Sequence, residues 1–246
     1  MLKIVAVGNS FSQDATTYLD RICEAAGKEV YVRNLYIPGC SLEAHAANIK
    51  GDALYSYQQR GVGTGINLTL TQGLTVEDWD IVTLQQASHF SGVEETYYPY
   101  INELSDYVKK LCPTAKQYIH KTWAYEWDFG SDAFANCYKK DQNYMYDCLS
   151  EAYASAAEKL GLPMILSGDV IQKLRKTEPF DYRNGGISLC RDGFHLSFNY
   201  GRYAAGAVWF ETLVGGDIRD NSYAPENTHP KLISLIKETV HEVCNK

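Results

Sequence analysis

The chain has 246 residues, of which 45% are hydrophobic, and this is the composition of a globular protein with a full apolar core. Its formal net charge is −7 and its pI is near 5.4. Nucleic acids and anionic membrane surfaces attract proteins through an excess of lysine and arginine, so we expect neither as a partner. The expected ligand is neutral or weakly charged.

No stretch of the sequence approaches the roughly 18 consecutive apolar residues of a membrane span. Strand-like sequence begins at Leu2 without a signal peptide ahead of it, so we expect a cytoplasmic protein, or a secreted or periplasmic one if an upstream signal has been removed. The seven cysteines are odd in number and lack CxxC spacing, so we predict neither a disulfide framework nor a metal site. The sequence does not indicate an oligomeric state.

The first 37 residues predict a strand, a helix and a second strand. Leu2 to Val7 is a nearly continuous apolar run, which is typical of a parallel strand covered on both faces. From Asp14 to Ala26, apolar residues recur at helical spacing. Val30 to Ile37 alternates between apolar and polar residues and ends at Pro38-Gly39. This order predicts a βαβ unit with a right-handed crossover.

Residues 40–78 depart from this alternation of strands and helices. Glu43 to Ile49 is compatible with one or two helical turns. Tyr55 to Thr71 contains three glycines and then an alternation of apolar residues. We interpret the region as a hairpin or excursion beside the main sheet.

Three further strands alternate with helices over the rest of the chain. The strands are predicted at Trp79–Leu84, Gln117–Thr122 and Pro163–Leu166. The helices are predicted at Tyr98–Leu111, Gln142–Lys159, Val170–Arg175, Tyr200–Leu213 and Pro230–Cys244. Five strands alternating with helices predict an α/β fold, a three-layer α/β/α sandwich with a mainly parallel five-stranded sheet, in which residues 1–246 form a single domain.

Polar or aromatic clusters follow the carboxyl ends of four predicted strands. They are Asn9-Ser10, Gly39 to Ser41, Gln85 to His89, and Trp123 to Trp127. Ligands bind outside the carboxyl ends of the strands in open parallel sheets, so these clusters are expected to share one crevice.

Ser10 is the candidate nucleophile of this crevice. A serine hydroxyl is not ionised near neutral pH and needs a base within hydrogen-bond reach. His195 and Asp192 are three positions apart with Gly193 between them, and they can supply the base and the group that orients it. A non-catalytic interpretation stays open, in which Ser10 only caps the following helix and His195 is structural.

Acyl transfer also needs hydrogen-bond donors for the oxyanion of the tetrahedral intermediate. The backbone amides of Ser10 and Gly39 are candidates, and the side chain of Gln86 or His89 is a candidate third donor. Gln86, like its neighbour Gln85, could instead be a buried structural amide.

Trp123 and Tyr125 are candidate substrate-binding residues, because aromatic rings stack on sugar faces. Both positions are equally compatible with the core. Cys40 lies five residues before His45, but no second paired motif accompanies them, so neither a zinc site nor a cysteine nucleophile is favoured over Ser10.

These residues resemble the sequence blocks of the SGNH/GDSL hydrolases. Gly8 to Ser12 resembles the first block, Gly39 the second-block glycine, and Asp192 to His195 the closing Asp-x-x-His block. A bacterial branch called DUF4886 is more closely similar. The segments that carry this closer resemblance are Gly8–Ser12, Trp79–Ser88, Thr122–Tyr125 and Arg191–Ser197.

The resemblance implies a flavodoxin-like sandwich with strand order 2-1-3-4-5 and an esterase or acylhydrolase activity, frequently on acetylated sugars. It implies no metal and no organic cofactor. Two positions depart from the family pattern: Asn9 stands where the family usually has aspartate, and the third block, Gly-x-Asn-Asp, is absent. A gapless overlay places Ala87 on its glycine and His89 on its asparagine, whereas polarity favours Gln86.

The sequence therefore predicts a serine hydrolase of carboxylic esters, with the O-acetyl group of a carbohydrate or another small-molecule ester as its substrate. A second hypothesis is a non-catalytic carbohydrate- or small-ligand-binding module on the same scaffold. A third is a lipid or thioester acylhydrolase, which would have an apolar trough in place of the aromatic cluster.

Overall fold

One mixed sheet of seven strands forms the centre of the protein, for which the computed structural model describes residues 1–245. In chain order the strands are β1 (Leu2–Gly8), β2 (Val30–Tyr36), β3 (Tyr55–Gln59), β4 (Val62–Leu68), β5 (Ile81–Leu84), β6 (Lys116–His120) and β7 (Met164–Ile165). They lie in the order β4-β3-β2-β1-β5-β6-β7. The pairs from β2 to β7 are parallel, whereas β3 is antiparallel to both β2 and β4.

The parallel part of the sheet agrees with the sequence prediction. The five predicted strands correspond to β1, β2, β5, β6 and β7, and their order β2-β1-β5-β6-β7 is the predicted order 2-1-3-4-5. Ile4 to Val7, at the centre of β1, are at most 1% exposed, as expected for a parallel strand covered on both faces. The predicted three-layer α/β/α sandwich is confirmed.

The prediction of five strands is wrong, because the hairpin in residues 40–78 joins the main sheet. β3 pairs with the carboxyl end of β2, where Asn34 lies opposite Gln58. Tyr55 and Tyr57 of β3 are only 0% and 5% exposed, so this strand extends the apolar core beyond β2. β4 is exposed along almost its whole length and forms the edge.

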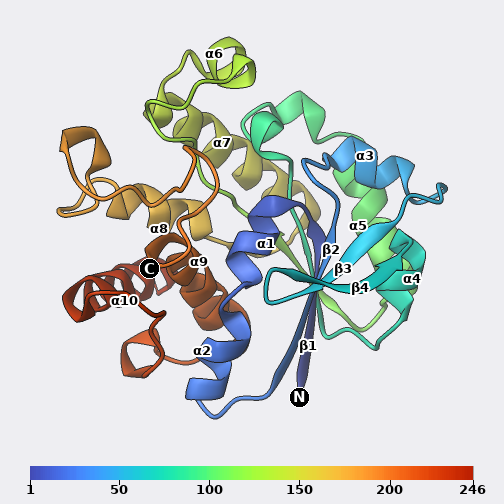
Figure 1. The fold of residues 1–246 in the computed structure, drawn as a ribbon. Coiled ribbons are helices and arrows are strands. Elements are labelled where there is room, and N and C mark those ends of the chain that lie inside the picture. Colours follow the sequence, from blue (N-terminus) through green and yellow to red (C-terminus); the bar gives the residue numbers. More distant parts are fainter. Residues whose placement is uncertain (246) are drawn as a thin grey trace.

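Helices cover both faces of the sheet (Figure 1). One face carries α1 (Ser10–Thr16), α2 (Leu19–Ala25), α8 (Ser167–Leu174), α9 (Tyr200–Trp209) and α10 (Pro230–Cys244). The other carries α3 (Leu42–Ala47), α4 (Leu70–Thr75), α5 (Tyr100–Leu111) and α7 (Gln142–Leu160). α6 (Asp132–Tyr138) lies beyond the carboxyl ends of the strands, at the top of Figure 1.

Short helical turns complete the chain. The 3-10 turns are η1 (Ser88–Phe90), η2 (Glu94–Thr96), η3 (Tyr182–Asn184) and η5 (Ile218–Asp220), and α9 continues into a π-helical turn, η4 (Phe210–Val214).

The helix predicted at Asp14–Ala26 begins earlier and is divided into α1 and α2. The hydroxyl of Thr16 donates to the carbonyl of Ser12, and that of Thr17 donates to the carbonyl of Gln13, at 2.9 and 2.8 Å. Such side-chain bonds to the preceding turn bend helices. The break lies at residues 17 and 18, between the end of α1 and the start of α2.

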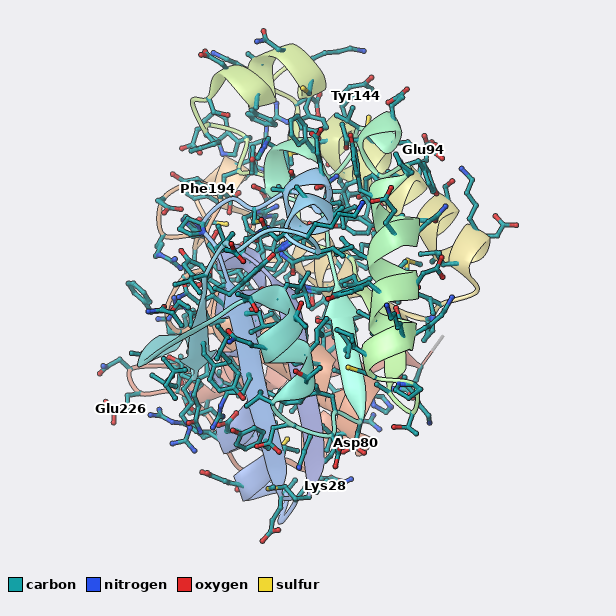
Figure 2. The ribbon with its side chains drawn as sticks, turned by 90° about the vertical axis from the view of Figure 1, so that its right-hand side faces the viewer. Lys28, Asp80, Glu94, Tyr144, Phe194 and Glu226 are labelled. Atoms are coloured by element: carbon teal, nitrogen blue, oxygen red, sulfur yellow. The ribbon has the colours of Figure 1, made fainter. Side chains whose placement is uncertain are left out.

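The carboxyl ends of the parallel strands all meet at one edge of the sheet. Figure 2 shows Phe194, from the loop that carries His195, at the end of the molecule opposite Lys28 and Asp80. Lys28 and Asp80 lie just before β2 and β5, so Phe194 lies at the carboxyl end. Within residues 1–245, the helices are all too short or too polar to cross a membrane.

Candidate active site

Ser10 is the first residue of α1, directly after the end of β1. The helix is capped by Asn9, whose Oδ1 accepts a hydrogen bond from the amide of Phe11 at 3.0 Å, while Ser12 Oγ accepts from the amide of Asn9 at 3.1 Å. This reciprocal arrangement is a capping box. Because the side chains of Asn9 and Ser12 form the cap, the hydroxyl of Ser10 is left for another partner.

That partner is His195, which is itself hydrogen-bonded to Asp192. Ser10 Oγ lies 2.9 Å from His195 Nε2, and His195 Nδ1 lies 2.7 Å from Asp192 Oδ2. A carboxylate only accepts hydrogen bonds, so Nδ1 carries the proton and Nε2 is free to accept the proton of Ser10. The structure thus brings together the three residues that the sequence singled out, across 185 positions in the chain.

The Asp192 carboxylate also organises its own loop. Its Oδ1 accepts the backbone amides of Phe194 and His195 at 3.3 and 2.8 Å, and Gly193 between them has a φ of +88°. Partial burial alone would raise the pKa of the Asp192 carboxyl, but the hydrogen bonds from the ring and amide of His195 outweigh it and lower that pKa. The carboxylate is therefore ionised near neutral pH and favours the Nδ1–H form of His195.

A buried carboxylate, Asp14, joins α1 to the segment Arg191–Leu196, which we call the His195 loop. Asp14 is fully buried and forms ion pairs with Arg191 and Arg202 at 3.0 and 2.7 Å. It also accepts the backbone amide of Leu196 at 2.8 Å. In the sequence, Asp14 is only the first residue of a predicted helix, and this role was not predicted. The available signal was an acid four residues after Ser10 in an otherwise buried helix.

Trp123 and Tyr125 support the His195 loop from beneath and do not line the crevice. The ring of Trp123 has no exposed surface, stacks on Phe11 at 4.3 Å and donates its indole N–H to the carbonyl of Phe194 at 2.8 Å. Tyr125 is 4% exposed, and its hydroxyl lies 2.9 Å from Ser88 Oγ. The structure therefore does not place the predicted aromatic platform at these two residues, because the flanking layers bury both rings.

Two backbone amides beside Ser10 lack an acceptor within the described part of the chain. They belong to Ser10 itself, at the free N-terminus of α1, and to Gly39, which has a φ of +60° in the turn after β2. Asn9 Nδ2 donates to the carbonyl of Cys40 at 3.1 Å and so ties the two segments together. Both predicted backbone donors are thus free to receive an oxyanion.

Gln86 is fully engaged away from the crevice. Its Nε2 donates to the carbonyl and hydroxyl oxygens of Thr96 at 3.0 and 3.1 Å, and its Oε1 accepts the amides of Leu42 and Ala87 at 2.9 and 2.8 Å. The side chain is fully buried. Gln86 therefore braces the turn after β5 against the start of α3 and offers no spare donor.

His89, the other predicted third donor, is half-buried in η1 and packs against Phe90 with ring centroids 4.2 Å apart. No hydrogen bond from its ring is formed to any residue in the range 1–245. Burial lowers the pKa of His89, which favours a neutral ring with one N–H. Of the two predicted side chains, His89 keeps a free donor.

A second pair of reactive residue types, Cys40 and His45, lies nearby. Cys40 Sγ is 3.4 Å from His45 Nδ1, which is also 2.8 Å from the hydroxyl of Tyr55. Burial raises the pKa of the Cys40 thiol to about 12 and lowers the pKa of His45 to about 3. Both groups are neutral at pH 7, so the sulfur is not the thiolate that nucleophilic attack requires.

A polar cavity of about 310 Å³ adjoins the outer side of the His195 loop. Its walls include Glu126, Asp128, Tyr182, Arg191 and Asp192. Charged and hydrogen-bonding groups line this part of the surface, so it suits a polar rather than an aliphatic ligand.

One group of side chains in the described chain has metal-ligand geometry. Potential ligand atoms of Glu211, Asp217 and His241 lie within 4.8 Å of one another. However, the guanidinium of Arg219 already binds both oxygens of Asp217, at 2.9 and 3.0 Å from Nε, and compensates the charge of that carboxylate. We assign no metal to this cluster.

The chain is similar to one family of proteins over almost its whole length. The family model described as a domain of unknown function, DUF4886, matches residues 3–243. The crystal structure of a DUF4886 family protein from Bacteroides uniformis is similar with a TM-score of 0.90 and 34% sequence identity, over 98% of this chain and 94% of that one.

Two more distant structures share the fold. A Slackia heliotrinireducens protein assigned to the SGNH hydrolases has a TM-score of 0.57 and 24% identity, over 86% of this chain and 98% of that one. A mutant of an acetyl-xylooligosaccharide esterase from Geobacillus has a TM-score of 0.53 and 13% identity, over 85% and 93%. Comparison with curated proteins gives no match.

Proposed function

The chain belongs to the DUF4886 family, and from that premise we propose that it is a serine hydrolase that cleaves carboxylic esters through an acyl-enzyme intermediate. The observation that carries the proposal is the hydrogen-bonded line from Ser10 through His195 to Asp192. The SGNH-type fold of the chain supports it, because that fold is the scaffold of known hydrolases.

The proposed reaction begins when Ser10 Oγ attacks the carbonyl carbon of the ester and its proton passes to His195 Nε2. Asp192 stabilises the imidazolium that forms. Collapse of the tetrahedral intermediate breaks the bond to the alcohol oxygen, which takes the proton from His195. Water then attacks the acyl-enzyme with His195 as the base, and the acid and free Ser10 are released. The net reaction converts an ester and water into an acid and an alcohol.

The proposed oxyanion hole consists of the backbone amides of Ser10 and Gly39, with the ring of His89 as a third donor. Each such donor contributes about 3–4 kcal/mol to transition-state stabilisation in well-studied enzymes. Gln86, the other residue considered for this role, is left out because its amide is already bonded to Thr96.

We propose the O-acetyl ester of a carbohydrate as the substrate class. The polar walls of the cavity beside Asp192 support a hydroxyl-rich ligand, whereas a lipid acylhydrolase would need an apolar trough. Trp127 is 42% exposed, and its ring centroid lies 6.3 Å from that of Tyr182, which lines the cavity. These two rings offer faces on which a sugar could stack. The Geobacillus esterase of acetylated xylooligosaccharides has the same fold, which is compatible with this class.

The proposal is tested by measuring acetate release from O-acetylated mono- and oligosaccharides, beside short- and long-chain p-nitrophenyl esters. Wild type is compared with Ser10→Ala and with Ser150→Ala, a matched control on α7 whose hydroxyl only bonds the preceding turn. We expect loss of turnover in Ser10→Ala alone. Full turnover in Ser10→Ala would exclude Ser10 as the nucleophile, and saccharide binding without turnover would favour a non-catalytic module.

A further inference from the structure

Four polar side chains form a buried chain of hydrogen bonds across the carboxyl edge of the sheet. Asn9 follows β1, Gln85 follows β5, His120 ends β6, and Ser167 follows β7. These are four neighbouring strands of the sheet, and each of the four side chains is at most 1% exposed. This chain of hydrogen bonds therefore runs beneath Ser10, and its first member, Asn9, directly precedes the proposed nucleophile.

The distances fix which atoms are joined. Gln85 Nε2 lies 2.8 Å from Asn9 Oδ1, His120 Nδ1 lies 2.7 Å from Gln85 Oε1, and His120 Nε2 lies 3.0 Å from Ser167 Oγ. The ring of His120 is also held between Trp209 and Trp123, with centroid distances of 5.0 and 6.2 Å.

The acceptor role of Asn9 Oδ1 determines which atom donates in each hydrogen bond between these four side chains. Asn9 Oδ1 already accepts the amide of Phe11, so Gln85 must present its Nε2 to that oxygen. Gln85 Oε1 is then an acceptor, which requires the proton of His120 on Nδ1 and leaves Nε2 to accept from Ser167. Burial lowers the pKa of His120 to about 3, so the ring is neutral and has one tautomer at pH 7.

The Asn9 end of the chain holds both proposed backbone donors. Asn9 directly precedes the amide of Ser10, and its Nδ2 binds the carbonyl of Cys40, the residue after Gly39. If the amide of Asn9 rotated, its oxygen would face the carbonyl of Cys40 and the two segments would separate. Gln85 opposes this rotation, because its Nε2 needs the oxygen of Asn9 as an acceptor.

We propose that Gln85 and His120 are positioning residues that set the spacing of the Ser10 and Gly39 amides through the orientation of Asn9. This inference rests on the proposed function and extends it to residues that do not touch the substrate. A contribution to stability alone does not explain why these four buried side chains are polar. Replacing paired buried polar groups by apolar groups of the same shape is often neutral or stabilising.

Two substitutions of His120 distinguish its hydrogen bond to Gln85 from its hydrogen bond to Ser167. An asparagine amide reaches as far from the backbone as Nδ1, so His120→Asn retains a donor for Gln85. A glutamine amide reaches as far as Nε2, so His120→Gln retains only the contact with Ser167. Gln85→Met removes the hydrogen bonds of Gln85 to Asn9 and to His120 at nearly constant side-chain volume. The matched control is Gln117→Met on β6, which loses a buried hydrogen bond to the carbonyl of Ser105 at 3.0 Å away from the site.

The measurements are kcat and KM for p-nitrophenyl acetate, the pH profile of kcat/KM, and the midpoint of thermal unfolding. For His120→Gln and Gln85→Met we expect kcat to fall about 10- to 100-fold, the loss typical of misplaced catalytic groups, with KM and the midpoint of the pH profile unchanged. His120→Asn is expected to restore kcat to near the wild-type value. Gln117→Met is expected to lower the unfolding midpoint without changing kcat.

The inference is overturned if His120→Gln and Gln85→Met keep the wild-type kcat, or if Gln117→Met, at a similar loss of thermal stability, loses as much kcat as they do. Failure of the proposed function looks different, because Ser10→Ala would then retain the activity of wild type. Loss of activity in Ser10→Ala together with full activity in Gln85→Met would contradict the positioning role alone.

Discussion

Asp14 and Arg191 join the helix that begins at Ser10 to the loop that carries His195. The two carboxylate oxygens of Asp14 lie 3.1 and 3.0 Å from Arg191 Nη1, although 177 positions separate the residues in the chain. Arg202 Nε binds the same carboxylate at 2.8 Å. The ion pairs therefore fix the position of the proposed base relative to the proposed nucleophile.

Replacing Asp14 by asparagine is expected to lower both stability and activity. Arg191 and Arg202 would lose their buried counter-charge, and both retain some contact with water, so we expect a loss of about 3 kcal/mol in the free energy of unfolding. Urea unfolding measures the change. The control is Asp106→Asn, which removes an exposed ion pair with Lys109 and should leave stability unchanged. Equal stabilities for both variants would contradict the structural role of Asp14.

Asn9→Asp is expected to reduce kcat, even though it restores the residue usual in SGNH hydrolases. Asn9 Nδ2 donates to the carbonyl of Cys40 at 3.1 Å, and an aspartate oxygen in that place would repel the carbonyl instead. We expect a fall of about tenfold in kcat for p-nitrophenyl acetate, with little change in KM. A kcat equal to or above that of wild type would show that the Cys40 contact does not set the site.

Two tryptophans in the loop between β6 and α6 are expected to have different roles, Trp127 in substrate binding and Trp123 in stability. Trp127→Ala should raise KM for an acetylated oligosaccharide and leave the hydrolysis of p-nitrophenyl acetate unchanged, because its exposed ring is a proposed sugar platform. Trp123→Ala removes a fully buried ring and should lower the free energy of unfolding by about 3–5 kcal/mol. An unchanged KM in Trp127→Ala would remove this ring from the substrate site.

Acid should destabilise the protein through its buried histidines. Burial lowers the folded-state pKa of His45 and of His120 to about 3, so below about pH 6.5 the unfolded chain binds protons that the folded chain excludes. The unfolding free energy should therefore fall as pH drops from about 6.5 towards 3, by about 1.4 kcal/mol per pH unit for each histidine. Urea unfolding of His45→Leu should show a pH slope smaller by one proton. An unchanged slope would mean that His45 is charged in the folded state.

The parallel core and the order of its strands could be predicted because each signal is local. The continuous apolar run at Leu2–Val7 and the alternation at Val30–Ile37 need no knowledge of distant contacts. The hairpin of β3 and β4 could be predicted from its glycines and alternating apolar residues, but its addition to the main sheet could not, because that depends on the free edge of β2. The break between α1 and α2 depends on hydroxyls that bond the preceding turn, which apolar periodicity does not reveal.

The proposed nucleophile, base and orienting acid could be selected from the sequence because their spacing and neighbouring glycines are distinctive. Gln85 and His120 could not, since their roles depend on side chains that lie 35 or more positions away. Asp14 could be noticed only as an acid four residues after Ser10, because its arginine partners lie 177 and 188 positions away. For Trp123, a substrate-binding role and a core position were equally compatible with the sequence, because its position after a strand is visible there but its stacking against Phe11 is not.

Covalent labelling can show whether Ser10 is the nucleophile and His195 its base. Wild-type protein is treated with a reactive organophosphonate and the modified residue is located by peptide mass spectrometry. We expect modification at Ser10, with loss of esterase activity in step, no modification in Ser10→Ala, and strongly slowed modification in His195→Ala. Inactivation by the phosphonate without modification of Ser10, or ester turnover at the wild-type rate in Ser10→Ala, would show that Ser10 is not the nucleophile.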